Sequence, residues 1–304
     1  MLHIKKIDHI QIPSSSAPVL VKETGNITQI RYMTRQQEAP IKKISKDYYI
    51  SLSDETGEVK EFQHKDSRAD NPHNVKKSLA MLRDLLNTNV TAPENCRWVT
   101  LTYAENMTDT KRLYDDFRKF NMRLRYKLPP YEYIVAMEPQ KRGAWHAHAV
   151  LIFEKPAPFL DNAVLAGIWG HGFVNVRPLK NVDNIGVYLT AYLGDMELPD
   201  ALLRGPVKAE SVKGVESIDG QGNKRQKAIV KGARLKLYPV GFRLFRYSKG
   251  IQRPIVRECT EGEAMQAVDG AKLTYEKAIR LTDESGKVIN TISYRHYNRK
   301  AKQV

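Results

Sequence analysis

The sequence has little cysteine and no long apolar run. Its 304 residues include two cysteines, Cys96 and Cys259, which lie far apart and form no CxxC pair. This excludes a disulfide framework and a zinc ribbon, and it fits a reducing cytosol. No apolar run approaches the ~20 residues of a membrane-spanning helix, and residues 1–13 lack the apolar region of a signal peptide. We therefore expect no membrane partner and a cytoplasmic location.

Acidic residues are also scarce relative to basic ones. The chain holds 34 Asp and Glu against 49 Lys and Arg, which gives a net charge of +15 and a pI near 9.6. Such an excess predicts a polyanionic partner, nucleic acid before membrane. The hydrophobic content of 41% is ordinary for a globular protein and is enough for one large or two small domains.

Acids are absent altogether from residues 224–257, which hold eleven Lys or Arg. Basic side chains neutralise phosphates, and the interleaved Tyr238, Phe242, Phe245 and Tyr247 could stack on unpaired bases. The alternative is a solvated strand pair with snorkelling lysines; we favour DNA binding. We assign DNA contacts to seven basic side chains: Lys141, Arg142, Arg234, Lys236, Arg243, Arg246 and Lys249.

The stretch from 131 to 153 contains a cluster of potential metal ligands. Residues 145–153 are apolar and β-prone, so His146 and His148 should lie on one face of a strand. A second strand over 131–138 and a Pro-Gly turn predict a hairpin that brings Glu138 near the histidines. Two imidazoles and a carboxylate suit a divalent ion with open positions. The alternatives are a polar sheet face and a surface charge at a turn.

Two tyrosines follow this hairpin. Ile185, Leu189 and Leu193 are spaced four apart and predict a helix. Tyr188 and Tyr192 are also four apart, so they should share one face of that helix. Taken alone, such a pair is typical of core or interface aromatics. Downstream of the carboxylate and the histidine pair, we interpret the two tyrosines as nucleophiles.

With these motifs the chain resembles the HUH endonucleases, and specifically the rolling-circle replication initiators (Rep) of bacterial plasmids, phages and Gram-positive mobile elements. The HUH motif corresponds to residues 145–148, the two-tyrosine motif to 188–192, and the FLTLT-like first motif to 98–103. The resemblance covers roughly residues 95–198. Two-tyrosine relatives often carry a lysine just before the second tyrosine. Here that position is Ala191, so any role of that lysine is absent or supplied elsewhere.

The resemblance implies a function and a site. Glu138, His146 and His148 would hold Mg²⁺ or Mn²⁺, and Tyr188 and Tyr192 would be catalytic. The protein would nick and rejoin single-stranded DNA at a hairpin origin through a covalent 5′-phosphotyrosine. A host helicase and DNA polymerase would be partners in the bacterial cytoplasm. Single-nucleophile relatives carry Glu at the position that matches Tyr188, so we expect Tyr192 to cut first.

Other readings remain open. A transposase or a mobilisation relaxase would use the same chemistry, although relaxases usually carry a third histidine and an N-terminal tyrosine. A non-catalytic, RRM-like nucleic-acid-binding protein would need exposed aromatics where this chain has His146 and His148. A cupin-like oxygenase would need an acid three or four residues after the second histidine, and Glu154 lies too far away.

The order of expected elements predicts the fold class. A strand at 97–103, a helix after Asp109, the hairpin, a helix near 159–168, a strand at 172–176 and the tyrosine helix give β-α-β-β-α-β-α. We expect an α+β fold with a mainly antiparallel sheet, a ferredoxin-like or split βαβ core, and N- and C-terminal extensions. Helices would cover one sheet face and the site the other. The loop residue His171 could serve as an acid or base, but we interpret it as structural.

The expected domains follow from composition. Residues 1–94 form an N-terminal extension with a hairpin over 47–63 and a helix after Pro72, and 95–198 form the nickase domain. Residues 199–223 form a linker rich in Gly, Pro and Ser. Residues 224–304 form a basic, β-rich region for DNA binding, closed by a hairpin that turns at 283–286.

Overall fold

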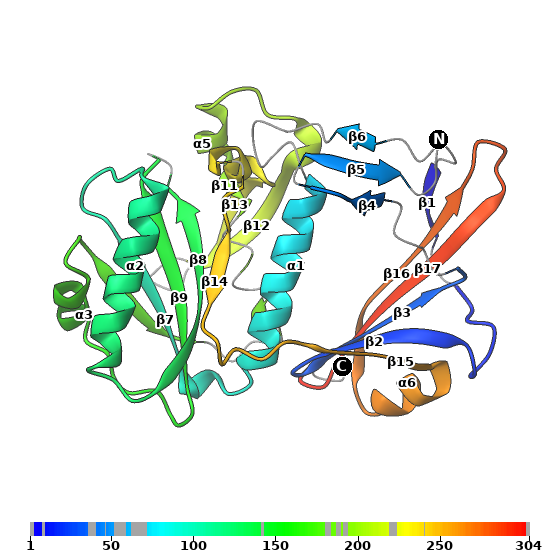
Figure 1. The fold of residues 1–304 in the computed structure, drawn as a ribbon, viewed down its shortest axis with the longest axis horizontal. Helices are drawn as coiled ribbons and strands as arrows, with labels where there is room; N and C mark the ends of the chain where they lie inside the picture. The colour runs from blue at the N-terminus through cyan, green and yellow to red at the C-terminus, as the bar shows by residue number, and fades with distance from the viewer. Residues whose placement is uncertain are drawn as a thin grey trace. The chain divides into compact units, whose positions relative to one another are not determined.

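The computed structural model of the chain forms two compact units (Figure 1). Residues 1–65 and 254–304 make one, which we call the end unit, and residues 66–253 make the other, the middle unit. The structure describes residues 3–7, 10–35, 41–45, 47–51, 59–61, 72–140, 143–179, 184–186, 190, 194–218, 224–239 and 241–301.

The middle unit is built on an antiparallel five-stranded sheet with the order β10-β7-β9-β8-β14. Its strands are β7 (Cys96–Thr102), β8 (Tyr131–Pro139), β9 (Trp145–Phe153), β10 (Val174–Pro178) and β14 (Phe245–Tyr247). Helix α2 (Thr110–Arg125) follows β7 and α3 (Asn162–Trp169) follows β9, which gives the chain order of a split βαβ layer. The predicted α+β class with a mainly antiparallel sheet is confirmed. Strand β14 adds a fifth strand from the region predicted to bind DNA.

Helix α2 begins as the sequence indicates. The Asp109 side chain accepts hydrogen bonds from the backbone N–H groups of Lys111 and Arg112, at 2.8 and 3.3 Å, which satisfies two otherwise unpaired donors. The predicted apolar stripe is buried in the core of the sheet: Leu113, Phe117, Phe120 and Leu124.

The two faces of this sheet bury different sets of side chains. On one, the α2 face, Leu101, Met137 and Ala147 share a core with residues of α2 and α3. On the opposite, the α1 face, Ile134 and Val150 share a core with helix α1 (Pro72–Asn89). The prediction of helices on one face only is therefore wrong for α1. The apolar stripe of α1 must be covered, and the α1 face supplies an apolar surface for it.

A second, three-stranded sheet with the order β11-β13-β12 completes the middle unit. Its strands are β11 (Met196–Glu197), β12 (Val212–Ile218) and β13 (Lys224–Val230), and helix α5 (Leu198–Leu202) and the 3-10 helix η4 (Ala233–Leu237) accompany them. Met196, Ala201 and Val230 form its small core. The predicted linker over 199–223 is thus wrong where the chain is described, because α5 and β12 occupy it. Its Gly, Pro and Ser residues lie between short elements that pair at long range.

The end unit is a six-stranded antiparallel sheet with the order β1-β16-β17-β3-β2-β15. Its strands are β1 (His3–Ile7), β2 (Pro18–Thr24), β3 (Ile27–Met33), β15 (Ile255–Thr260), β16 (Lys272–Thr282) and β17 (Val288–Asn298). Helix α6 (Glu261–Ala267) contributes Ala264 to a core with Val21 and Ile30. A smaller sheet contains β4 (Ile41–Lys43), β5 (Tyr48–Ser51) and β6 (Val59–Glu61). The pairing of β5 with β6 and of β16 with β17 agrees with the two predicted hairpins.

The predicted domain boundaries do not coincide with these units. Strand β17 pairs with β3 and β15 pairs with β2, so the two ends of the chain build one sheet instead of two separate extensions. Residues 224–253 belong to the middle unit and not to the region that follows them. Pairing between strands more than 200 residues apart leaves no local pattern in the sequence, which is why composition alone misplaces the boundaries.

Candidate active site

The predicted ligands Glu138, His146 and His148 lie on the α1 face. Strands β8 and β9 pair so that Glu138 is opposite His146 and Ala136 is opposite His148. His146 and His148 alternate with Ala147 and Ala149, which are fully buried in the core of the α2 face. The expected alternation of the strand is therefore present, and the hairpin brings the carboxylate beside the histidine pair.

Glu138 and His148 are in direct contact. The Nε2 atom of His148 lies 2.9 Å from Oε2 of Glu138, whose side chain is buried. On the other side of the imidazole, Nδ1 lies 3.1 Å from the hydroxyl of Thr100, and Trp98 stacks on the ring at a centroid distance of 5.4 Å. A threonine hydroxyl both donates and accepts, so Thr100 can hold either tautomer of His148.

The residues present fit a divalent ion at two of three positions. Ligands at 90° on an octahedral ion with bonds of 2.0–2.1 Å are about 2.9 Å apart, and this is the separation of Glu138 Oε2 and His148 Nε2. The ring of His146 lies 5.8 Å from that of His148, at 78° to it. Among the described residues, no group of three or more His, Cys, Asp or Glu is arranged to hold a metal ion. The three-ligand site therefore stays a prediction.

Arg234 is the residue of this site that the sequence assigned differently. It was predicted to contact DNA, but its side chain is 16% exposed and its guanidinium forms an ion pair with Glu138. Its Nη1 also donates to the carbonyl of Pro139 at 3.2 Å, and its Nε donates to the carbonyl of Asp195 at 3.0 Å. All three contacts are with protein. The structure therefore corrects the assignment of Arg234 as a phosphate contact.

Both catalytic tyrosines of the sequence prediction, Tyr188 and Tyr192, lie outside the described residues. Parts of their segment are described, and Ile185 is buried in the core beneath α1 as the apolar stripe predicts. The backbone N–H of Gly186 donates to the side chain of Asn87 of α1 at 2.8 Å. A Cβ at Gly186 would lie 2.5 Å from the carbonyl oxygen of Arg83. The segment therefore starts against α1, at a place where only glycine fits.

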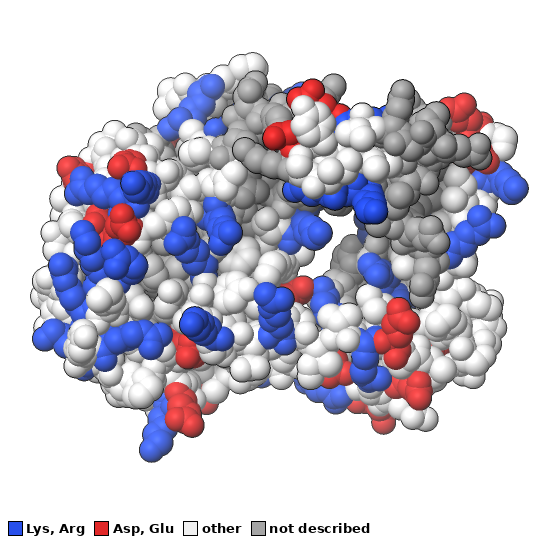
Figure 2. Space-filling view, viewed as in Figure 1, with Lys and Arg blue, Asp and Glu red and all other residues white. Residues whose placement is uncertain are grey.

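The other predicted DNA contacts fall into two groups. Lys141 and Arg142 lie outside the described residues, whereas Lys236, Arg243, Arg246 and Lys249 are exposed. The sequence did not identify Tyr114 of α2, whose hydroxyl donates to the carbonyl of Arg243 at 2.9 Å and whose ring lies 3.5 Å below the guanidinium of Arg246. Figure 2 shows basic side chains spread over this side of the middle unit, with fewer acidic ones. Helix α2 adds five exposed basic side chains: Lys111, Arg118, Lys119, Arg123 and Arg125.

The interleaved aromatics do not stand ready to stack on bases. Tyr238 and Phe242 are buried in the core of the α2 face, where Phe242 stacks on Trp145 at 4.6 Å. Phe245 and Tyr247 are half-buried and stack on each other at 6.3 Å. The base-stacking prediction is therefore wrong for Tyr238 and Phe242. Folding against the nuclease sheet buries them, and the spacing of a basic run does not reveal this.

We expect the exposed arginines to matter for DNA binding. Replacing Arg243, Arg246 and Lys249 by Ala should reduce the slope of log affinity against log salt by up to roughly 0.7–0.9 per lost phosphate contact. Fluorescence anisotropy with labelled single-stranded DNA across a salt series measures this slope. Lys227→Ala is a matched control, because Lys227 is already paired with Glu197 at 2.8 Å. A slope unchanged in the triple variant would place the DNA on another surface.

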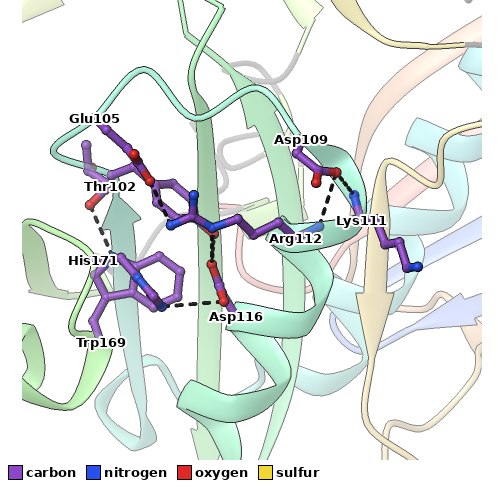
Figure 3. Close-up of polar contacts among 9 residues, drawn as sticks. Thr102, Glu105, Asp109, Lys111, Arg112, Asp116, Trp169 and His171 are labelled. Atoms are coloured by element: carbon purple, nitrogen blue, oxygen red, sulfur yellow. Dashed lines mark hydrogen bonds and ion pairs between the residues drawn. The ribbon is translucent and has the colours of Figure 1, made fainter.

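A second polar cluster lies on the α2 face and is centred on Asp116 (Figure 3). This buried carboxylate accepts a hydrogen bond from the hydroxyl of Tyr103 at 3.0 Å, and it lies 3.4 Å from Nε of Arg112 and 3.5 Å from Nε2 of His171. Burial, together with the carboxylate of Asp116, raises the pKa of Tyr103 well above its usual range. Tyr103 is thus a neutral donor. The cluster fastens the loop of His171 to α2, and it lies on the face opposite His146 and His148, as the structural interpretation of His171 expects.

The Asp116 cluster should stabilise the fold and take no part in cleavage. Asp116→Ala removes the acceptor used by Tyr103 and should lower the free energy of unfolding by about 1–3 kcal/mol, as urea denaturation would measure. The neighbouring exposed Asp115→Ala should change it by less than about 0.5 kcal/mol. Equal stability of the two variants would contradict a structural role for this cluster.

Comparison with known proteins places the candidate site in a replication family. No curated protein matches the chain, and no solved structure does. Among the described residues, no helix is both long and apolar enough to cross a membrane. Residues 96–197 match the family model of the ORF2-type replication-associated proteins, which spans β7 to β11 and the three predicted ligands. This match, over about a third of the chain, implies DNA binding and supports a replication-initiator role.

Proposed function

We propose that the protein initiates rolling-circle replication by nicking and rejoining single-stranded origin DNA through a covalent tyrosine ester. The observation that carries the proposal is the contact between Glu138 and His148, 2.9 Å apart on the α1 face. It lies within the region that matches a replication family, and two tyrosines at helical spacing follow it in the sequence. The positive charge of the chain suits a DNA substrate.

Glu138, His146 and His148 would hold Mg²⁺ or Mn²⁺ on this face. Such an ion would polarise the scissile phosphate and orient it for in-line attack. Within this chain, Thr100 fixes the imidazole of His148 through Nδ1, so that Nε2 faces Glu138. A hydrogen-bonded second partner of this kind keeps a ligand in the required orientation.

The tyrosine would supply the nucleophile. Its hydroxyl oxygen attacks phosphorus, the bond from phosphorus to the 3′ oxygen breaks, and the tyrosine proton ends on that oxygen as a 3′-OH. The 5′ end stays on the protein as a phosphotyrosine ester, and the free 3′-OH can prime synthesis. Because one phosphate ester replaces another, a second 3′-OH can reverse the step and rejoin the strand without ATP.

A second tyrosine would allow a second cut before the first strand is released. Tyr188 and Tyr192 are one helical turn apart in the predicted helix, about 5.4 Å in pitch. Both could therefore face one metal, although not equally. This arrangement would let one protein molecule both start and end a round of replication, which also distinguishes an initiator from a transposase or a relaxase of the same chemistry.

A cleavage assay tests the proposal. The full-length protein would be incubated with single-stranded DNA from the origin of its parent replicon, labelled at either end. We expect one fragment with a free 3′-OH and one attached to protein at its 5′ end. A joined-strand product should form when a second 3′-OH strand is added. Binding without cleavage, in the presence of Mn²⁺, would instead indicate a non-catalytic nucleic-acid-binding protein.

A further inference from the structure

Arg234 connects two parts of the candidate site that are far apart in the sequence. It lies on η4 and forms an ion pair with Glu138 at the end of β8, where it also binds the carbonyl of Pro139. Its Nε binds the carbonyl of Asp195, just after the segment that contains Tyr188 and Tyr192. Asp195 is held a second time, because its side chain accepts the backbone N–H of Gly232 at 3.1 Å.

The two oxygens of Glu138 have different partners. Oε1 is bound by the guanidinium of Arg234, and Oε2 lies 2.9 Å from Nε2 of His148. A guanidinium is a rigid, planar donor, so its contact with Oε1 fixes the rotation of the carboxylate. Oε2 is then directed towards His148, at the spacing of two neighbouring ligands of one octahedral ion. Arg234 thus leaves the oxygen that faces His148 available to a metal.

A buried ion pair could also serve stability alone. Such pairs contribute little net stability when compared with an apolar replacement of the same shape. Here the geometry adds something that stability does not need, namely a single side chain that holds a candidate ligand and the end of the tyrosine segment together. Partners that orient metal ligands from behind typically change metal affinity or activity by 10- to 100-fold when they are removed.

We propose that Arg234 is a positioning residue, which orients Glu138 for the metal and fastens the end of the tyrosine segment beside it. This rests on the proposed function, since it assumes that Glu138 is a ligand. It replaces the sequence-based assignment of Arg234 to DNA contact. The role belongs to this chain's own residues and can be measured without DNA.

The test is the affinity of the full-length protein for Mn²⁺ alone, followed by the EPR signal of free Mn²⁺. Arg234→Met should weaken Mn²⁺ binding by about 10- to 100-fold, and Arg234→Lys should weaken it towards the lower end of that range. Lys236→Met is the matched control. It removes the same charge from the same 3-10 helix, but Lys236 is exposed, so Mn²⁺ affinity should stay at the wild-type value. Thermal unfolding of each variant identifies those that fold.

The outcomes separate this proposal from the proposed function. A folded Arg234→Met variant with wild-type or tighter Mn²⁺ binding would overturn the positioning role, and so would a reduced salt slope of DNA binding with unchanged Mn²⁺ affinity. If Arg234→Met does not fold, Arg234→Lys decides, because an ammonium group cannot reproduce the planar fork; wild-type affinity in that variant would also overturn the role. Mn²⁺ binding that His146→Ala and His148→Ala do not weaken would instead defeat the metal centre itself, and the positioning role with it.

Discussion

Nicking by the double variant His146→Ala with His148→Ala is expected to fall by about a thousandfold or more, because a bound metal contributes several kcal/mol to the transition state. Binding of single-stranded DNA should change little, since the two side chains are half-buried on the α1 face and the exposed basic residues lie elsewhere in the sequence. EDTA should have the same effect on the wild-type protein, and added Mn²⁺ or Mg²⁺ should restore cleavage only where the histidines are present. A gel-based assay with end-labelled origin DNA measures the rate.

His171→Gln provides the control for loss of an imidazole. His171 contacts Asp116 on the opposite face of the sheet, so its replacement should leave nicking near the wild-type rate. Equal losses in the His171 variant and in the double variant would mean that both act through stability. Full activity of the double variant, or of the wild-type protein in chelator, would rule out the metal centre.

The second large effect is expected at the tyrosines. Tyr192→Phe should lose most initial cleavage, because Phe keeps the ring but lacks the attacking oxygen. Tyr188→Phe should still nick once but should fail to release closed circles, because the terminating transfer needs the second hydroxyl. Both expectations derive from the resemblance to replication initiators, in which a Glu replaces the first tyrosine of single-nucleophile members.

Tyr126→Phe is the matched control for the loss of a phenol, since Tyr126 is exposed at the end of α2. Its cleavage and closure should equal those of the wild-type protein. Equal cleavage by the two single variants would show that the tyrosines are interchangeable. Normal cleavage by the double variant Tyr188→Phe with Tyr192→Phe would return both tyrosines to a role in packing.

Local periodicity was enough to predict the candidate ligands. The alternation of residues 145–153 placed His146 and His148 on one face, and the Pro-Gly turn placed Glu138 beside them, as the strand pairing shows. The apolar stripe of α2 was predicted for the same reason, because spacing along one helix depends on neighbours only. Capping by Asp109 also has a local cause.

Long-range packing was beyond this kind of reasoning. Nothing near Arg234 in the sequence indicates that its guanidinium reaches Glu138, almost a hundred residues away. Tyr238 and Phe242 have the composition of a base-stacking surface, yet pairing of β14 with β8 accompanies their burial. The cover that α1 provides on the site's own face likewise depends on tertiary contact, with Leu82 packed in one core with Val150.

The central claim is a tyrosine ester formed at a metal-dependent site, and the covalent adduct tests it most directly. The wild-type protein would be incubated with Mn²⁺ and single-stranded origin DNA, digested with nuclease and trypsin, and examined by mass spectrometry. Trypsin should release residues 181–204 as one peptide, and its fragmentation spectrum should place the residual 5′-phosphate nucleotide on Tyr192. The adduct should be absent when EDTA replaces Mn²⁺. Cleaved DNA with no nucleotide on this peptide, or an adduct on another residue, would contradict the account.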